Sequence, residues 1–421
     1  MKVLHFCSFY RPLGGAEKLL FNVLDLLEQN GVENVIVAPE LGSNGPTGLR
    51  KEYFVEFLEF PFSRSTLYAS LSRNWALLRV LRQILRLEKP DVVHLHNQQN
   101  PFIYLACLMS GTPMVRNVHD PRLYCPTNWR LLPDKSLCPH AFGRACLTEG
   151  CVKPTMADAR QLFATIFNRQ LSFWKTTLIM ESRETWAMAI QNGYREDQLC
   201  LIPNCTPLPP LQQEMEEKAS HEDSSQNTLL FVGRASYEKG LHFLLNALPR
   251  VRNDFKLFIL TAGDYYEQQI APLVERLGLG SKVEVRFDTS YKDTATFYSK
   301  ADVVVVPSIW FEPFCMIGIE AYSHLTPVVA TRTGGIKDWC VDGETGFLVD
   351  IFDEYALARR IDDLLDNPAL RKEFGINGYR RVQQNYTDKI YFQRLYALYE
   401  KVTQDGKDYS YRLPGMARRA V

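Results

Sequence analysis

Apolar and polar positions follow two alternating patterns along the chain. Short apolar runs such as "KVLHFC" and "ENVIVA" are typical of buried strands, whereas "AEKLLFNVLDLLEQ" repeats its apolar positions every three to four residues, as an amphipathic helix does. The alternation continues through "DVVHLH", "TPMVRNV" and "TTLIMES" to "LCLIPNC" at 199–205. It predicts an α/β fold with a parallel sheet that helices cover on both faces.

The pattern is interrupted once and then resumes. The segment "TPLPPLQQEMEEKASHEDSSQ", residues 206–226, is polar, has three prolines and lacks an apolar period, so we expect a linker. Strand and helix patterns return at 227–385, and "DKIYFQRLYALYEKV" predicts a final helix within 386–405, before a weakly patterned tail at 406–421. We therefore expect two doubly wound, Rossmann-like domains, 1–205 and 227–385, which face a ligand-binding cleft.

Composition adds limits to this picture. The chain of 421 residues is 46% hydrophobic and carries 48 basic and 48 acidic residues, and this neutral balance argues against a general nucleic-acid binder. No apolar run reaches the roughly 18 residues of a membrane span, and we expect the N-terminal "MKVLHFCSFY" to be a strand rather than a signal peptide. We expect a cytoplasmic protein with mostly reduced thiols.

The stretch "FVGRASYEKG" places Arg234 and Lys239 in a loop between a strand and a helix. Two cations five residues apart at a strand end can hold one anion from two sides. The alternative is a pair of solvated surface charges.

The stretch "PSIWFEPFCMIGIEAYS" places Glu312 and Glu320 on either side of a mostly apolar run. Such a pair could be the acid and base of a glycoside hydrolase, could hold a metal, or could bind the hydroxyls of a sugar nucleotide. Pro313 is suited to the first turn of a helix, whose unpaired N–H groups would form an anion site. These N–H groups would lie near Phe314, Cys315 and Met316.

Two glycine pairs follow strands in corresponding places of the two domains. Gly14 and Gly15 lie in "PLGGAEK", and Gly334 and Gly335 lie in "TRTGGIKDW". Glycine allows a backbone to approach a ligand closely. One such pair is a weak indication, and the repetition strengthens it.

Three histidines are expected at strand ends of the first domain. His119 ends the strand of "VHD" and would lie at the rim of the cleft. His94 and His96 form an H-x-H pair, which a metal site can use, but no third ligand has a supporting spacing. We therefore interpret this pair as a polar sheet edge.

Four cysteines, Cys125, Cys138, Cys146 and Cys151, fall in one loop-like segment with His140 nearby. The segment has no C-x2-C pair, so a structural zinc, a disulfide and unliganded thiols all remain open. A second open question concerns the helix at 71–88, where arginines alternate with leucines. Arg73, Arg79, Arg82 and Arg86 could contact an anionic membrane surface or form a solvated edge.

The motifs taken together resemble a known family. "GGAEK", "PDVVHLH", "VHD", "LIPN", "FVGRASYEKG", "PSIWFEPF" with "IEA", and "PVVATRTGG" with "GETGFLV" occur in the order found in the family-four retaining glycosyltransferases, which have the GT-B fold. The E-x7-E motif with the upstream arginine and lysine is the most specific part. The resemblance implies metal-independent transfer of a sugar from a UDP- or GDP-linked donor to a carbohydrate or lipid-linked acceptor, in polysaccharide or glycoconjugate biosynthesis.

The same resemblance implies a role for each matching residue. Arg234 and Lys239 would hold the donor diphosphate, Glu312 the transferred sugar and Glu320 the ribose. His119 would lie beside the reacting sugar, Gly15 would approach the phosphates, and the last helix would cross back to the first domain. Two residues depart from the family pattern, Cys315 and His324, where glycine is expected.

Other functions remain as alternatives at this stage. A glycoside hydrolase would use Glu312 and Glu320 but would leave Arg234 and Lys239 without a role. A sugar-nucleotide epimerase on the same fold is a second alternative, and an inactive nucleotide-sugar-binding module is a third.

Overall fold

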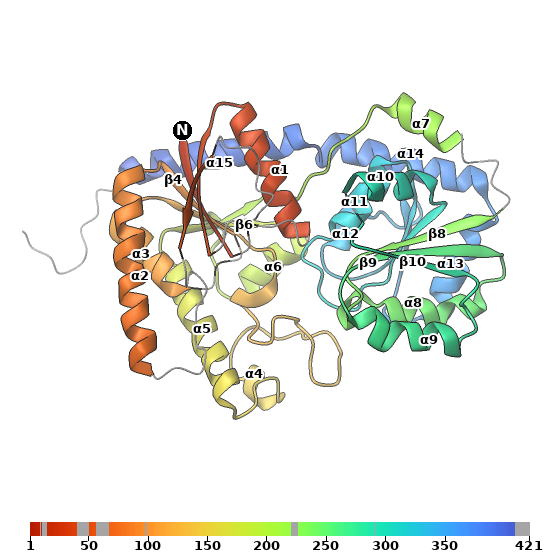
Figure 1. Cartoon of the computed structure of the whole chain (residues 1–421), viewed down its shortest axis with the longest axis horizontal. Coiled ribbons are helices and arrows are strands. Elements are labelled where there is room, and N and C mark those ends of the chain that lie inside the picture. Colours follow the sequence, from red (N-terminus) through yellow and green to blue (C-terminus); the bar gives the residue numbers. More distant parts are fainter. Residues whose placement is uncertain are drawn as a thin grey trace, which may run out of the picture.

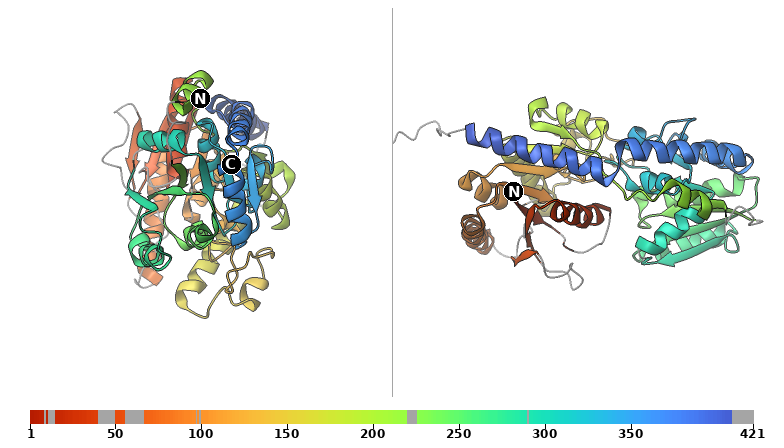
Figure 2. Two further views of the ribbon diagram at one scale, coloured as in Figure 1. Left: turned by 90° about the vertical axis from the view of Figure 1, so that its right-hand side faces the viewer. Right: turned by 90° about the horizontal axis from the view of Figure 1, so that it is seen from above.

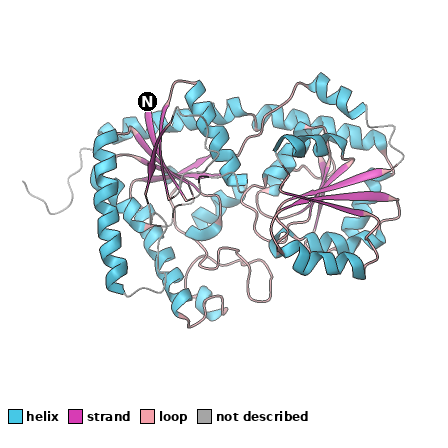
Figure 3. Cartoon of the chain, viewed as in Figure 1, coloured by secondary structure: helices cyan, strands magenta, loops and turns pink. Residues whose placement is uncertain are grey.

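The protein is described by a computed structural model for residues 1–8, 10, 15–39, 50–55, 67–96, 98, 100–219, 226–289 and 291–408. These residues form two α/β domains that lie side by side, each with a central sheet and helices on its faces (Figures 1 and 3). The expected fold class is therefore confirmed.

The first domain contains a parallel sheet of seven strands in the order β3-β2-β1-β4-β5-β6-β7. The strands are β1 (Lys2–Cys7), β2 (Glu33–Ala38), β3 (Lys51–Phe54), β4 (Val92–His96), β5 (Met114–Asn117), β6 (Thr176–Met180) and β7 (Leu199–Leu201). All five residues of β4 are buried, as expected for a central strand that helices cover on both faces. The edge strand β3 lacks buried residues, and for this reason its pattern was not recognisable in the sequence.

The helices of the first domain follow the strands as the sequence predicts. They are α1 (Gly15–Gln29), α2 (Leu67–Glu88), α3 (Pro101–Ser110), η1 (Pro121–Leu123), α4 (Ala145–Thr148), α5 (Met156–Ser172), α6 (Arg183–Gln191) and η2 (Glu196–Gln198). Apolar residues of α2 and α3 form one core with the sheet, including Leu81, Leu85 and Tyr104.

The second domain contains a parallel sheet of six strands in the order β10-β9-β8-β11-β12-β13. The strands are β8 (Asn227–Val232), β9 (Phe255–Thr261), β10 (Val283–Phe287), β11 (Val303–Val306), β12 (Val328–Thr331) and β13 (Gly346–Val349). The helices are η3 (Tyr237–Lys239), α8 (Leu241–Ala247), η4 (Leu248–Arg250), η5 (Tyr266–Ile270), α9 (Ala271–Arg276), α10 (Tyr291–Lys300), α11 (Met316–Ser323), α12 (Ile336–Trp339), α13 (Glu354–Leu365) and α14 (Pro368–Asn385). The loops at the carboxyl ends of β8, β11 and β12 carry the charged and glycine motifs.

The last helix, α15 (Asp388–Asp408), lies along the first domain although it follows the second in sequence (Figure 2, right). Its Leu395 and Tyr399 pack in one cluster with Val3 of β1 and Leu19 of α1. Burial of this apolar face fixes the helix to the first domain. The helix includes residues 406–408, which the sequence assigned to the tail, and 409–421 lie outside the described residues.

The linker expected at 206–226 contains a helix, α7 (Leu211–Ala219), so that prediction is wrong for nine of its residues. The helix packs against α10 of the second domain. Its Glu214 is 1% exposed, and the carboxylate bonds to Nδ1 of His324 at 2.9 Å. This helix is fixed by a buried polar contact instead of an apolar stripe. Its sequence therefore has no apolar period from which a helix could be predicted.

The arginine-bearing helix α2 has the two-sided character that its pattern predicts. Leu78, Leu81 and Leu85 are buried, whereas Arg79 and Arg86 are exposed. None of the helices that the structure describes has the length and apolar character needed to cross a membrane.

Candidate active site

The loop after β8 brings its lysine to the carboxyl edge of the second sheet. Gly240 ends this loop with φ of 70°, and a Cβ there would lie 1.8 Å from the carbonyl oxygen of Pro307. The close approach of the two backbones holds Lys239 beside the loop that follows β11. The Nζ atom of Lys239 lies 2.8 Å from Oε1 of Glu312. Arg234 remains exposed, with its guanidinium 4.0 Å from Glu238.

The carboxylate of Glu312 is buried and held by two donors. In addition to Lys239, the hydroxyl of Ser308 donates a hydrogen bond to the same oxygen at 2.6 Å. Burial by itself would raise the pKa of Glu312, but the charge of Lys239 and these two hydrogen bonds outweigh it and hold the pKa below its ordinary value. Burial likewise opposes the charge of Lys239, and Glu312 raises its pKa. Lys239 and Ser308 therefore favour the charged, carboxylate form of Glu312.

The helix that carries Glu320 begins later than the sequence predicts. The first helical residue of α11 is Met316, and Pro313 lies in the preceding loop, so the expected position of Pro313 in the first turn is wrong. The reason is Cys315, which has φ of 67° and therefore cannot belong to a right-handed helix. Phe314 has a buried side chain and accepts a hydrogen bond from Trp339 through its carbonyl oxygen.

Glu320 lies inside α11, away from the lysine. Its side chain is 8% exposed, and the hydroxyl of Tyr298 donates a hydrogen bond to Oε2 at 2.8 Å. The two glutamates of the motif thus have different partners: Glu312 is paired with a cation, and Glu320 with a neutral phenol.

The structure changes the interpretation of both departures from the family pattern. Cys315 occupies a backbone conformation that favours glycine. In "AYSHLTP" the residue with such a conformation is Leu325, with φ of 56°, and His324 has φ of −106°. The expectation that His324 replaces the glycine is therefore wrong by one residue.

The glycine pair after β12 approaches the protein's own backbone. A Cβ on Gly334 would lie 2.0 Å from the carbonyl oxygen of Glu312, and one on Gly335 would lie 2.3 Å from that of Pro313. The amide of Gly335 also donates a hydrogen bond to the carbonyl oxygen of Glu312 at 2.7 Å. The sequence predicts that this glycine pair approaches a ligand, whereas in the structure the pair approaches the Glu312 loop and fixes it.

The first domain faces this site through the start of α1. A Cβ on the exposed Gly15 would lie 3.8 Å from the sulfur of Met316, the first residue of α11. The beginnings of two helices from different domains are thus opposite each other. Gly14 lies outside the described residues.

His119 follows β5 and is held by an acid that the sequence analysis missed. Its Nδ1 bonds to the carboxylate of Glu181, the residue directly after β6, and the two side chains are 5% and 3% exposed. Burial lowers the pKa of His119, but the charge and hydrogen bond of Glu181, with the charges of Asp120 and Glu17, together outweigh burial and raise the pKa above its ordinary value. One indication of this contact was present in the sequence: a polar residue follows each of the two apolar runs that form the neighbouring strands β5 and β6.

The H-x-H pair has a third neighbour, His5 of β1, which the sequence spacing could not reveal. Within the described residues, His5, His94 and His96 are the only three possible metal ligands whose ligand atoms lie within 4.8 Å of one another. Both nitrogens of His5 already contact His96 and Asn34, and both nitrogens of His94 contact Tyr399 and Asn117. The histidines thus form a buried hydrogen-bonded network on the inner strands β1 and β4, and not the polar sheet edge that the sequence predicts.

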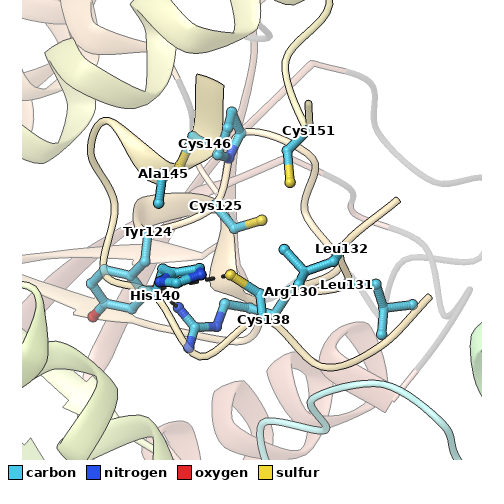
Figure 4. A pocket seen from close by; sticks show the side chains of 11 residues that line it. Tyr124, Cys125, Arg130, Leu131, Leu132, Cys138, His140, Ala145, Cys146 and Cys151 are labelled. Atoms are coloured by element: carbon cyan, nitrogen blue, oxygen red, sulfur yellow. Dashed lines mark hydrogen bonds between the residues drawn. The ribbon is translucent and has the colours of Figure 1, made fainter. Parts of the chain in front are cut away.

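The cysteine-rich segment gathers its four thiols around one cavity, which His140 and Arg130 also line (Figure 4). All four cysteines are free. Burial raises the pKa of Cys146 and Cys151, and the neighbouring thiols raise it further. Apart from the three histidines, no three possible ligand atoms in the described part of the chain lie within 4.8 Å of one another. The four sulfurs are therefore farther apart than the ligands of one zinc ion.

Comparison with known proteins agrees with this architecture. Residues 13–208 match Glycosyltransferase Family 4, and residues 212–381 match Glycosyl transferases group 1. The Anabaena protein HepE in complex with UDP-glucose has the same fold, with a TM-score of 0.70 at 17% identity over 95% of this chain and 100% of that one.

Two relatives are similar in sequence. The phosphatidyl-myo-inositol mannosyltransferase of Mycobacterium leprae is 27% identical over 95% of this chain and 96% of its own length. The capsular polysaccharide biosynthesis glycosyltransferase CapM of Staphylococcus aureus is 29% identical over 46% of this chain and 51% of its own length.

The fold and the matches define a glycosyltransferase with the GT-B architecture, as the sequence predicts. More narrowly, the chain belongs to the group 1, family 4 glycosyltransferases, which retain the anomeric configuration, use nucleotide-sugar donors and typically need no metal. This membership excludes the hydrolase and the epimerase as the main activity.

Proposed function

We propose that the Glu312 loop and the loop after β8 form the donor site for a UDP- or GDP-linked sugar, and that the sugar is transferred to a carbohydrate or lipid-linked acceptor. The observation that carries this proposal is the contact between Lys239 and Glu312, because it brings a cation suited to phosphate and an acid suited to sugar hydroxyls to one strand edge. The relatives support the ligand classes: HepE was solved with UDP-glucose, and the mycobacterial enzyme is named for a lipid-linked acceptor.

Each charged group has a separate role in this proposal. Arg234 and Lys239 bind the diphosphate together with the N–H groups of Phe314 and Cys315, which precede α11, and that of Met316, its first residue. Gly15 approaches the phosphates from the first domain. Cations placed before the reaction stabilise the charge that grows on the leaving diphosphate.

The two glutamates bind hydroxyl groups in this proposal. Glu312 accepts hydrogen bonds from the transferred sugar, and Glu320 accepts them from the ribose. In the free protein Lys239 neutralises Glu312, so donor binding requires Lys239 to share its hydrogen bonds between carboxylate and phosphate.

His119 lies beside the reacting sugar in this proposal, where its cationic form donates a hydrogen bond. Glu181 supports this state because it raises the pKa of the imidazole. The proton of the acceptor hydroxyl passes to an oxygen of the departing diphosphate on the same face of the sugar. A separate protein base is then unnecessary.

A ligand panel tests the donor site directly. UDP, GDP, UDP-glucose and GDP-mannose are each added to the full chain, and thermal unfolding is followed. One nucleotide should raise the midpoint, because a ligand that binds only the folded state stabilises it. A chain that none of the four stabilises would contradict the proposed donor site.

We further propose that the four-cysteine cavity binds a structural zinc ion, which would draw the four sulfurs closer together than they lie in the metal-free protein. Four thiolates match the ligand preference of zinc, and the buried guanidinium of Arg130 lies on the same cavity, where it offsets their negative charge. Cobalt loaded in place of zinc should give the charge-transfer absorption of thiolate ligands. Cys138→Ser should weaken this absorption, and the control Cys200→Ser, outside the segment, should keep it. Freshly purified protein without zinc, or equal spectra of both variants, would contradict the site.

The exposed face of α2 supports a proposal of peripheral membrane contact on the cytoplasmic side. Arg79 and Arg86 lie on this face with Trp75 and Leu87, which are 56% and 65% exposed. Cations with interleaved apolar side chains bind anionic lipid surfaces. Sedimentation with vesicles of phosphatidylglycerol and phosphatidylcholine should show binding that Arg79→Glu with Arg86→Glu removes. Equal sedimentation of wild type and variant would contradict it.

A further inference from the structure

The cysteine-rich segment contains a small hairpin that reaches out of the first domain (Figure 1). Leu131 and Leu137 form an antiparallel bridge, and the amide of Cys138 donates to the carbonyl oxygen of Arg130 at 2.8 Å. The turn is closed by the amide of Lys135, which donates to Leu132 at 2.8 Å. We call residues 129–138 the cross-domain hairpin. These hydrogen bonds give it a defined shape although it is mostly exposed.

The cross-domain hairpin contacts the second domain through three side chains. The ring of Trp129 meets that of Trp310 edge to face at 5.5 Å, and the guanidinium of Arg130 lies 5.9 Å from the ring of Phe311. The Nζ atom of Lys135 lies 4.1 Å from the centre of the Tyr237 ring.

These contacts are made on both sides of the proposed donor site. Tyr237 lies in the loop between Arg234 and Lys239, and Trp310 and Phe311 directly precede Glu312. The ring of Trp310 is also 5.4 Å from Nζ of Lys239. The hairpin therefore lies against the two loops that carry the charged motifs, although it belongs to the other domain.

The charge of Lys135 is not neutralised by an acid within the described residues, where no ion pair includes it. Its field reaches the second domain: burial lowers the pKa of His242, and the charge of Lys135 lowers it further. An exposed lysine on the ring of Tyr237, in the loop that carries Arg234 and Lys239, adds positive potential where the diphosphate is proposed to bind.

We propose that the cross-domain hairpin is part of the nucleotide-sugar site and that Lys135 is a third cation for the diphosphate of the donor. This inference rests on the proposed donor site and extends it to a residue of the first domain. Trp129 and Arg130 position the hairpin through their contacts with Trp310 and Phe311. Lys135 can reach a bound phosphate by turning about its flexible side chain, because a cation–π contact at an exposed site is weak.

Calorimetric titration with UDP and GDP tests this inference in the full chain. Lys135→Gln should weaken the binding of the preferred diphosphate by roughly three- to tenfold at low salt, as expected for one partly exposed ion pair with a doubly charged group. The difference should shrink at high salt, because exposed charges are screened. The corresponding nucleoside without phosphate should bind both proteins equally.

Two further variants distinguish the effect of the Lys135 charge from the effect of the shape of the cross-domain hairpin. Lys153→Gln removes another exposed lysine of the first domain and should leave diphosphate binding unchanged. Trp129→Ala loosens the hairpin without removing a charge, and its effect should not depend on salt.

The outcomes are distinct. Equal affinity of wild type and Lys135→Gln, with wild type binding UDP or GDP, would overturn this inference and leave the donor site standing. A loss in Lys153→Gln as large as in Lys135→Gln, or a salt-independent loss in Lys135→Gln that Trp129→Ala reproduces, would also overturn it. A wild-type chain that binds neither diphosphate would overturn both proposals.

Discussion

Lys239 and Glu312 neutralise each other at the carboxyl edge of the second sheet, with Nζ of the lysine 2.8 Å from Oε1 of the glutamate. The two residues come from the loops after the neighbouring strands β8 and β11, and 73 positions separate them in sequence. Ser308 fixes the same carboxylate oxygen. This pair joins the phosphate-binding and sugar-binding parts of the proposed site before a donor binds. The effect of a substitution should therefore depend on which of the two parts it removes.

Substitution of the two glutamates should affect different kinetic constants. Glu320→Ala removes a hydrogen bond to the ribose, which is bound alike before and during the reaction, so the donor KM should rise roughly ten- to a hundredfold with little change in kcat. Glu312→Ala removes a group that faces the sugar where positive charge develops, so kcat should fall. Its affinity for the bare nucleotide diphosphate should remain almost intact, because Lys239 is still present.

Steady-state kinetics and calorimetry of both variants check this division. The control is Glu344→Ala, an exposed glutamate of the second domain that has no proposed donor contact. If Glu312→Ala and Glu320→Ala both bind the nucleotide as wild type does and lose kcat equally, the division of roles is wrong.

Removal of the imidazole should affect turnover and spare nucleotide binding. His119 belongs to the first domain, and the diphosphate groups are proposed to bind mainly to the second. His119→Ala should therefore lower kcat strongly while calorimetry shows an unchanged affinity for the nucleotide diphosphate. A variant that turns over as wild type does would make His119 a structural residue.

The contact between His119 and Glu181 should be visible as a dependence on pH. Because Glu181 raises the pKa of His119 in the folded state, the contact stabilises the fold fully below the ordinary pKa of about 6.5, and this contribution is lost as pH rises through the folded pKa. Glu181→Gln should lower the pKa of His119 in an NMR titration. The difference in unfolding free energy between wild type and variant should be larger at about pH 6 than at about pH 9. A difference that is constant or grows with pH would contradict this assignment.

Gly334 should be far less tolerant of substitution than another glycine with positive φ. Gly334 has φ of 48° and Gly343 has φ of 78°, but a Cβ would collide with Glu312 only at Gly334, since Gly343 has open space around it. Gly343→Ala should cost about 1–2 kcal/mol of unfolding free energy from backbone strain. Gly334→Ala should cost more than this and should also lower kcat, because the Glu312 loop must move. Equal stability losses in denaturant unfolding would show that the close approach is unimportant.

Chelation of metal ions should lower the stability of the protein and leave its catalysis unchanged. Protein cations bind the diphosphate in the proposed mechanism, so EDTA should leave the initial rate of transfer unchanged. If the cysteine cavity holds zinc, prolonged chelation should lower the thermal midpoint, because a ligand of the folded state is removed. Activity that EDTA abolishes at once and magnesium or manganese restores would contradict metal-independent transfer.

The sequence alone determined the two-domain α/β fold. Parallel strands covered on both faces must be largely apolar, as the four valines of β11 are, and this makes them recognisable without any knowledge of their neighbours. The charged and glycine motifs were also visible, because residues that act together at a strand end lie within a few positions of the strand. Local patterns failed where a segment is fixed by a distant partner: α7 depends on the contact of Glu214 with His324.

Only the tertiary structure decided which of these residues meet. Glu181 and His119 are 62 positions apart, and they come together because β5 and β6 are neighbours. The meeting of Trp129 with Trp310 depends on how two whole domains are placed. A sequence pattern reports the local period of burial, whereas such contacts follow from the order of strands and the packing of domains, and many residues far from the site determine both.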